Sequence, residues 1–201
     1  MFHQIPDEKY IAVDLDGTII ENSIFSCVFR KLFFIDPFRT VASIASCILF
    51  GPNKITSRHL KRNLHLVGLD KKDETRLKFN KVLLNFLKEM QKMGKVLILA
   101  TGSDQYLADV IAQYTEEHFD LKFDIVIGSE PGFLCISENK LKKLRDINPE
   151  FAYIGNSSQD FPLWRAKGVN MICVGNENFR FVAQERCYKP AFLTKIGRAH
   201  V

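Results

Sequence analysis

The sequence lacks a run of about twenty apolar residues, the length that an α-helix needs to cross a bilayer. Its most apolar stretch, residues 33–51, is interrupted by Asp36, Pro37 and Arg39, and the remainder of about eleven residues is too short to span. The first ten residues are polar and contain no apolar segment of the kind found in secretory signals. We therefore expect a cytoplasmic protein, with contact at a membrane surface left open.

The sequence also lacks a Cys-x-x-Cys pair, an internal repeat and a low-complexity segment. Its five cysteines are odd in number and lie mostly in apolar runs, such as residues 171–174. This pattern favours buried, reduced thiols over a disulfide framework or a zinc site. With 46% hydrophobic and 25% charged residues, the 201-residue chain has the composition of a folded globular protein.

The formal net charge of +5 is concentrated in one segment. Residues 21–78 contain eleven Lys or Arg against five Asp or Glu, so the rest of the chain is close to neutral. Such a segment attracts a phosphorylated substrate, an anionic membrane surface or nucleic acid, or it is simply a solvated basic face. No nucleic-acid recognition motif accompanies the charge, so we expect no nucleic-acid partner.

Short apolar runs alternate with helical patterns through most of the chain, and each run ends at Gly, Asp, Thr or Asn. This alternation predicts an α/β fold, a Rossmann-like parallel sheet with helices on both faces. In such sheets the ligand site lies beyond the carboxyl ends of the strands. The expected strands are residues 9–13, 95–100, 123–127, 151–154 and 170–174, and the expected helices are residues 79–93, 105–114, 140–147 and 161–167.

Residues 21–79 interrupt the alternation, because they are apolar and basic, helical in pattern and punctuated by Pro and Gly. We expect them to form an inserted helical cap, with residues 1–20 and 80–195 as the α/β core and 196–201 as a frayed tail. The aromatic residues of the cap recur near helical spacing and are expected to pack in its core rather than to form a lipid slot. They are Phe25, Phe29, Phe33 and Phe34.

Two carboxylates, Asp14 and Asp16, follow the first expected strand directly. If the chain turns at Gly17, both can face one pocket, where their mutual repulsion attracts a hard divalent cation such as Mg²⁺. The first carboxylate can attack phosphorus to form an aspartyl-phosphate, and the second can protonate the leaving oxygen and later deprotonate water. An Asp-x-Asp-Gly sequence also occurs in ordinary turns and in calcium loops.

The order of the motifs resembles the haloacid dehalogenase superfamily. Residues 14–18, Asp-Leu-Asp-Gly-Thr, are similar to its first motif, and residues 99–103 are similar to its second, in which Thr101 would hydrogen-bond the phosphoryl group. Lys140 matches the lysine of the third motif best, with Lys142 and Lys143 as close competitors. The resemblance implies a catalytic set of Asp14, Asp16, Thr101 and Lys140, with Gly102 and Ser103 binding substrate.

The fourth motif departs from the family pattern. The family has Gly-Asp followed by a second Asp, whereas residues 155–160 place Asn156 at the first acidic position and Asp160 at the second. An amide oxygen can still bind Mg²⁺ but attracts it less strongly than a carboxylate. The implied metal ligands are Asp14, Asp16, Asn156 and Asp160. In the cap, Arg58 and Arg62 are candidates for binding the anionic end of a substrate.

Residues 100–105 and 153–166 more closely resemble the haloacid dehalogenase domain fused ahead of UbiA-type prenyltransferases. That resemblance implies a magnesium-dependent phosphatase acting on a phosphorylated small molecule or on a lipid- or prenyl-linked phosphate. The alternative is a binding or regulatory module of low activity that docks on a membrane or partner through its basic cap. The sequence leaves the oligomeric state and the substrate open.

Overall fold

The computed structural model describes residues 6–21, 77–130 and 132–175, together with the single positions 34, 37, 38, 41, 42, 45, 179, 182 and 186. Most of the predicted cap, including Arg58 and Arg62, lies outside these residues, so the proposed division into core and cap stays a prediction. The described parts contain no helix that is long and apolar enough to cross a membrane.

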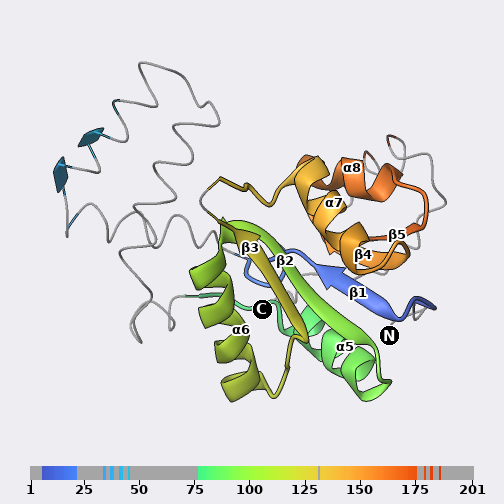
Figure 1. Cartoon of the computed structure of the whole chain (residues 1–201). Coiled ribbons are helices and arrows are strands. Elements are labelled where there is room, and N and C mark those ends of the chain that lie inside the picture. Colours follow the sequence, from blue (N-terminus) through green and yellow to red (C-terminus); the bar gives the residue numbers. More distant parts are fainter. Residues whose placement is uncertain are drawn as a thin grey trace.

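Five parallel strands form one sheet in the order β3-β2-β1-β4-β5 (Figure 1). The strands are β1 (Tyr10–Val13), β2 (Val96–Asp104), β3 (Ile125–Ser129), β4 (Phe151–Gly155) and β5 (Val169–Cys173). Their near-continuous apolar sequences suit a sheet covered on both faces, and the predicted α/β fold is confirmed. The chain builds outward from β1 to one side and then to the other, so the strand order switches beside β1, where such sheets bind ligands.

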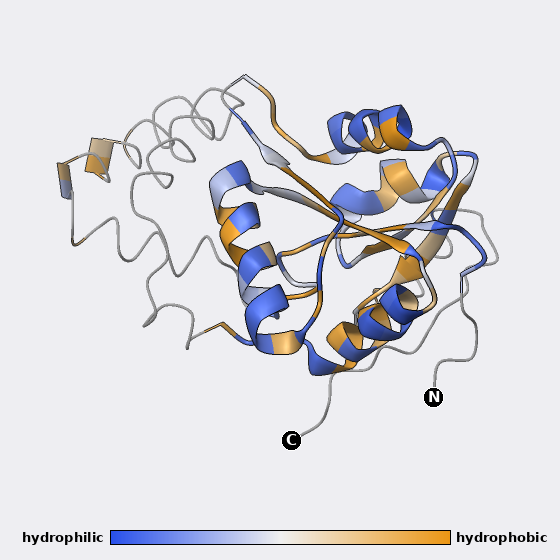
Figure 2. Cartoon of the chain, turned by 60° about the horizontal axis from the view of Figure 1, so that its bottom comes forward, coloured by the Kyte–Doolittle hydropathy of each residue, from blue (hydrophilic) through white to orange (hydrophobic). Residues whose placement is uncertain are grey.

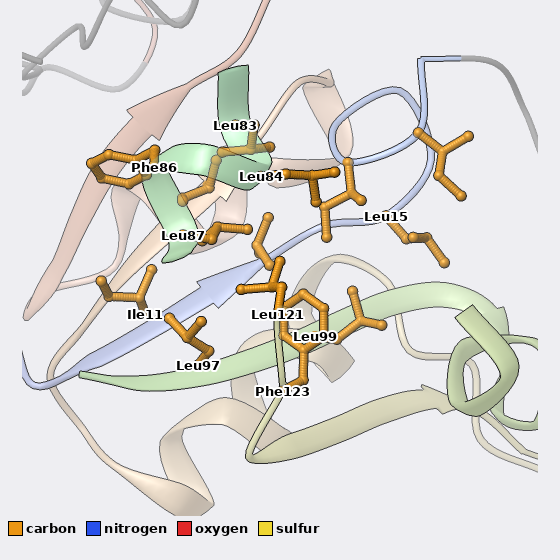
Figure 3. Close-up of a cluster of buried hydrophobic side chains, with 14 of the residues drawn as sticks. Ile11, Leu15, Leu83, Leu84, Phe86, Leu87, Leu97, Leu99, Leu121 and Phe123 are labelled. Atoms are coloured by element: carbon orange, nitrogen blue, oxygen red, sulfur yellow. The ribbon is translucent and has the colours of Figure 1, made fainter. Parts of the chain in front are cut away.

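The helices cover the two faces of the sheet in pairs. On one face lie α5 (Lys81–Lys92) and α6 (Gln105–Phe119); on the other lie α7 (Ser137–Ile147) and α8 (Phe161–Arg165) (Figure 1). Successive residues of β1 serve opposite faces, as Ile11 packs in the first cluster and Ala12 in the second. Figure 3 shows Leu83 and Leu87 of α5 in the first cluster with Ile11, and Figure 2 shows the apolar strands between helices with hydrophilic outer sides.

The two ends of the predicted insertion lie together beside the carboxyl end of β1. Ile20 and Phe79 form an antiparallel bridge, and the Glu21 amide donates to the carbonyl oxygen of Lys78 at 2.8 Å. Asn80 then begins α5, because its side chain accepts a hydrogen bond from the Leu83 amide at 3.1 Å. The chain therefore leaves the core and returns to it at one place, next to the strand ends.

Most element bounds differ from the sequence-based expectation by three residues or fewer, and two ends differ by more. β2 continues to Asp104, beyond the predicted end at residue 100, because its pairing with β3 shifts register between Ala100 and Asp104. α6 continues to Phe119, beyond the predicted end at residue 114, since Thr115 is buried against the core and the helix ends only where Asp120 adopts a left-handed φ of 51°. The first difference sets the backbone of the candidate site.

Candidate active site

The loop after β1 carries the first two carboxylates and turns at Gly17, as the sequence predicts. Gly17 has a φ of +76°, which side chains other than glycine rarely adopt, and a Cβ there would clash with Nδ2 of Asn156. The glycine therefore serves two purposes. It reverses the chain after Asp14 and Asp16, and it lets the side chain of Asn156, from the loop after β4, approach the turn closely.

Asp14 forms a buried ion pair with Lys140. The Lys140 Nζ lies 2.7 Å from Asp14 Oδ1, and the two residues are 4% and 9% exposed. Lys140 shares the inward face of α7 with Leu141 and Leu144, whereas the competing lysines Lys142 and Lys143 are exposed. The helix therefore selects Lys140 from the three lysines.

Burial and neighbouring charges shift the pKa values of both Asp14 and Lys140. Burial raises the pKa of Asp14 from 3.8 to about 6; Lys140 opposes this rise, while Asp160 and Asp16 add to it. Burial acts to lower the pKa of Lys140, but the carboxylates of Asp14 and Asp160 outweigh it and the pKa is raised. Lys140 is thus held as a cation, and Asp14 is a carboxylate whose charge needs a compensating partner.

Tyr153, in the middle of β4, joins Lys140 to Asp160. Its hydroxyl accepts from Lys140 Nζ at 2.9 Å and donates to Asp160 Oδ1 at 2.9 Å. Burial, and then the charge of Asp160, raises the pKa of Tyr153, so the hydroxyl keeps its proton. Sequence reasoning missed this residue; the only signal was one hydroxyl in an otherwise apolar strand, two positions before Gly155.

The other carboxylate oxygen of Asp160 holds the loop after β4. Asp160 Oδ2 accepts hydrogen bonds from the amides of Asn156 and Ser157, at 3.1 and 2.9 Å, and from the Ser157 hydroxyl at 3.2 Å. Asp160 is 2% exposed, and both of its oxygens are used in this way. Its service as a metal ligand stays a prediction; in the structure it fixes the loop that carries Asn156.

The carboxyl end of β2 contributes the second group of predicted site residues. Thr101 is 1% exposed, and its Oγ1 accepts a hydrogen bond from the Ser103 amide at 3.0 Å. The Ser103 hydroxyl donates to Asp16 Oδ2 at 2.7 Å, and the Gly102 carbonyl accepts from the Ser129 hydroxyl at 2.8 Å. Ser103, predicted to bind substrate, therefore also contacts the second carboxylate.

A cavity of about 310 Å³ brings these groups together beyond the carboxyl ends of β1, β2 and β4. It contains every predicted site residue of the core, and it adds an apolar wall from Leu107 and Ile136. Its lining residues are Asp14, Asp16, Thr101, Gly102, Ser103, Asp104, Leu107, Ile136, Lys140, Asn156, Ser157, Gln159 and Asp160. An anion entering it meets one buried cation and the ends of three strands.

The cavity lacks a compact cluster of acidic ligands among the described residues, but it has a buried oxygen suited to Mg²⁺. Within the described residues, no three His, Cys, Asp or Glu side chains form a cluster that could hold a metal ion. However, Asn156 lines the cavity, and its Oδ1 is buried with no hydrogen-bond partner among the described residues. Oγ1 of Thr18, which is not a lining residue, is unsatisfied in the same sense. A buried, unsatisfied amide oxygen close to carboxylates is a suitable ligand for a hard cation.

We compared the sequence of the chain with those of known proteins. No family model matches the chain. An uncharacterized protein of Sinorhizobium fredii, y4nM, is 27% identical over 154 residues, which cover 76% of this chain and 27% of y4nM. The chain thus spans only about a quarter of the length of this curated relative.

Solved structures align over most of the chain at low sequence identity. A substrate-bound phosphoserine phosphatase has a TM-score of 0.59 at 15% identity, covering 96% of this chain and 95% of its own. A phospho-aspartyl intermediate analogue of phosphoserine phosphatase has a TM-score of 0.52 at 15% identity, covering 90% and 91%. A haloacid dehalogenase-like hydrolase from Streptococcus pneumoniae has a TM-score of 0.56 at 19% identity, covering 87% and 90%. The chain therefore has the fold of haloacid dehalogenase-type hydrolases.

Proposed function

We propose that this protein is a phosphatase that hydrolyses a phosphate monoester through an aspartyl-phosphate on Asp14. The observation that carries the proposal is the buried pair of Asp14 and Lys140, 2.7 Å apart, in a cavity that also holds Asp16 and Thr101. The proposal is supported because a carboxylate in contact with a buried cation, at the carboxyl end of a central strand, can attack an anionic phosphoryl group.

The reaction needs two proton transfers and two displacements. In the first displacement an oxygen of Asp14 bonds to phosphorus, the bond to the leaving oxygen breaks, and Asp16 gives that oxygen a proton. In the second, Asp16 takes a proton from water, which attacks phosphorus and releases phosphate from Asp14. Lys140 has three N–H donors, of which two bond Asp14 and Tyr153; the third can stabilise a phosphoryl oxygen together with the Thr101 hydroxyl.

We further propose that Mg²⁺ is the cofactor, held by oxygens of Asp14, Asp16 and Asn156. Bound there, the ion neutralises charge on the phosphoryl oxygens and between the carboxylates. The unsatisfied Oδ1 of Asn156 supports this assignment, and the neutral amide predicts weaker binding than a third carboxylate would give. Asp160 would add its negative charge from behind Asn156.

The substrate is proposed to be a lipid-linked or prenyl-linked phosphate. This rests on the resemblance to domains fused ahead of prenyltransferases, and it is supported by the apolar wall that Leu107 and Ile136 add to the cavity. Most of the length of y4nM lies outside the matched segment, which leaves room in that relative for a further domain. A phosphorylated small molecule is the alternative substrate class.

A second function, docking on an anionic membrane surface through the cap, is favoured by the exposure of helical positions in the basic segment. Phe34 is 82% exposed, Phe38 is 88% exposed and Val41 is 56% exposed, and their spacing places them on one helix face. The prediction that Phe34 packs in a core is therefore wrong. Exposed apolar side chains within a segment of net positive charge suit the interface of an anionic bilayer.

Hydrolysis of p-nitrophenyl phosphate tests the primary proposal. Purified protein should release phosphate with Mg²⁺ and lose this activity on chelation. Asp14→Asn and Asp16→Asn should reduce kcat by more than about a hundredfold, because Asp14 forms the bond to phosphorus and Asp16 deprotonates the water that releases phosphate. Asp7→Asn, an exposed carboxylate far from the cavity, should leave activity unchanged. A folded wild-type protein that releases no phosphate from aryl or alkyl phosphates would overturn the proposal.

Co-sedimentation with vesicles of phosphatidylserine and phosphatidylcholine tests the second function. We expect binding that weakens as salt rises and that Phe38→Ser reduces. The absence of binding, or binding that changes neither with salt concentration nor in the Phe38→Ser variant, would contradict docking through this face. Neither result bears on the phosphatase assay, so the two functions are tested separately.

A further inference from the structure

We propose that Ser103 is a positioning residue that holds the carboxyl group of Asp16 for proton transfer to the leaving oxygen. The inference rests on the proposed phosphatase reaction and adds to it, because the sequence predicts Ser103 only as a substrate-binding residue. It would act through Asp16 and Thr101 rather than on phosphorus.

The contact between the two side chains is short and joins distant parts of the chain. Ser103 Oγ donates to Asp16 Oδ2 at 2.7 Å, across 87 positions of sequence. A hydroxyl at this distance from a carboxylate forms a charge-assisted hydrogen bond, roughly twice as strong as a neutral one. The bond links the end of β2 to the loop that follows β1, and both residues are partly buried in the cavity wall.

The backbone around Ser103 is fixed on both sides. Its amide donates to Thr101 Oγ1 at 3.0 Å, and the next residue, Asp104, caps α6 by accepting a hydrogen bond from the Tyr106 amide at 3.0 Å. The register shift of β2 falls between Ala100 and Asp104, so this short segment departs from a regular strand and pairs again at its end. Ser103 is therefore an anchored donor, whereas Asp16 lies on a tight loop.

This anchoring determines two proton positions at once. The Thr101 oxygen accepts from the Ser103 amide, so the hydroxyl hydrogen points away from Ser103 and is available to a phosphoryl oxygen of a substrate bound in the cavity. The Ser103 hydroxyl bonds Asp16 at Oδ2, which fixes the orientation of the carboxyl group and so the direction in which its proton is transferred. As the bond between phosphorus and the leaving oxygen breaks, that oxygen takes the proton of Asp16, and Ser103 keeps its own.

The leaving group provides a readout that a merely structural role would not move. A poor leaving group, such as an alkyl alcohol, needs the proton of Asp16 as it departs, whereas p-nitrophenolate leaves well without it. The ratio kcat/KM reports steps up to the first irreversible one, which is transfer to Asp14. Ser103→Ala should lower kcat/KM for an alkyl phosphate by about tenfold to a hundredfold, the equivalent of one hydrogen bond to a charged group, and change the aryl value by less than about threefold.

Three further variants and one control variant complete the experiment. Ser103→Thr keeps the hydroxyl and should restore alkyl activity, and Ser103→Cys, close to serine in shape, should behave like Ser103→Ala and replaces it if the alanine variant does not fold. Asp16→Asn should show the same dependence on the leaving group at larger amplitude. The matched control is Ser129→Ala, which removes the hydroxyl bonded to the neighbouring Gly102 carbonyl and should affect both substrates equally.

The outcomes separate cleanly. Selective loss on the alkyl phosphate with rescue by threonine supports the positioning role. Equal loss on both substrates, or no loss on either, overturns it while leaving the phosphatase intact. If wild-type protein hydrolyses neither substrate, the proposed function itself fails, and the role of Ser103 fails with it.

Discussion

Replacing Lys140 by methionine should destabilise the fold, and by an amount that grows with pH. Methionine keeps the unbranched shape of lysine but removes the cation that lies 2.7 Å from Asp14. Breaking a buried ion pair by removing one partner typically costs about 3 to 5 kcal/mol, because the remaining charge has no compensation. Asp14 can avoid part of this cost by taking up a proton, which makes the cost depend on pH.

The sign of that dependence follows from the raised pKa of Asp14. In the metal-free wild type the pKa of Asp14 in the folded state is about 6 against an ordinary value of 3.8, so the folded state holds this proton more tightly than the unfolded chain. Stability is therefore lost as pH rises from about 4 to 6, and this group causes no further change above pH 6. Without Lys140 the folded pKa is higher still, so the loss continues at about 1.4 kcal/mol per pH unit. Between pH 6 and 8 the variant should lose about 3 kcal/mol more than the wild type.

Urea unfolding measures this difference. Trp164 is the one tryptophan of the chain and is fully buried, so its fluorescence reports unfolding. The titrations are carried out with chelator at pH 6, 7 and 8, because a bound cation would lower the pKa of Asp14. Lys142→Met, at an exposed position of the same helix, should follow the wild type at every pH. A constant offset between Lys140→Met and the wild type across this range would refute the reasoning.

Two further substitutions address the network behind the cavity. Tyr153→Phe removes the hydroxyl between Lys140 and Asp160, and should lower the free energy of unfolding, measured by urea titration, by about 1.5 to 3 kcal/mol. In steady-state kinetics it should lower kcat and change KM less. An unchanged kcat would show that Lys140 does not need this hydroxyl. Asn156→Asp adds a negative charge beside the proposed cation and should lower the Mg²⁺ concentration for half-maximal activity by about tenfold or more. Gln159→Glu, at the exposed rim of the cavity, should change that concentration only slightly. Equal responses of the two variants would argue against Asn156 as a ligand.

The strands and the main site residues could be predicted because they depend on local sequence. Residues 11–13 and 151–154 are continuous apolar runs, and a run of this kind, ending in a polar residue, indicates a buried parallel strand and its carboxyl end. Lys140 could also be chosen locally, since helical spacing puts it on the face of Leu141 and Leu144 and puts its lysine neighbours outside.

The contacts of Tyr153 and Ser103 could not be predicted because they depend on how separate elements meet. The hydroxyl of Tyr153 gains its role only when α7 brings Lys140 to one side and η1 (Ser158–Asp160) brings Asp160 to the other. Ser103 reaches Asp16 because β2 continues past residue 100, and the polar sequence there indicates a turn rather than a strand. Both are matters of three-dimensional packing at a strand end.

The pairing of residues 19–21 with residues 78–80 closes the base of the insertion at one point of the core. The entry and exit chains are hydrogen-bonded to each other, so the two ends of the insertion are held together where they meet β1 and α5. The entropic cost of closing a flexible loop rises only slowly with its length, so inserts of different size can be joined to the core at this point with a similar cost in free energy. Under the proposed function, a change of insert would alter substrate selectivity while Asp14, Asp16 and Lys140 stay in place.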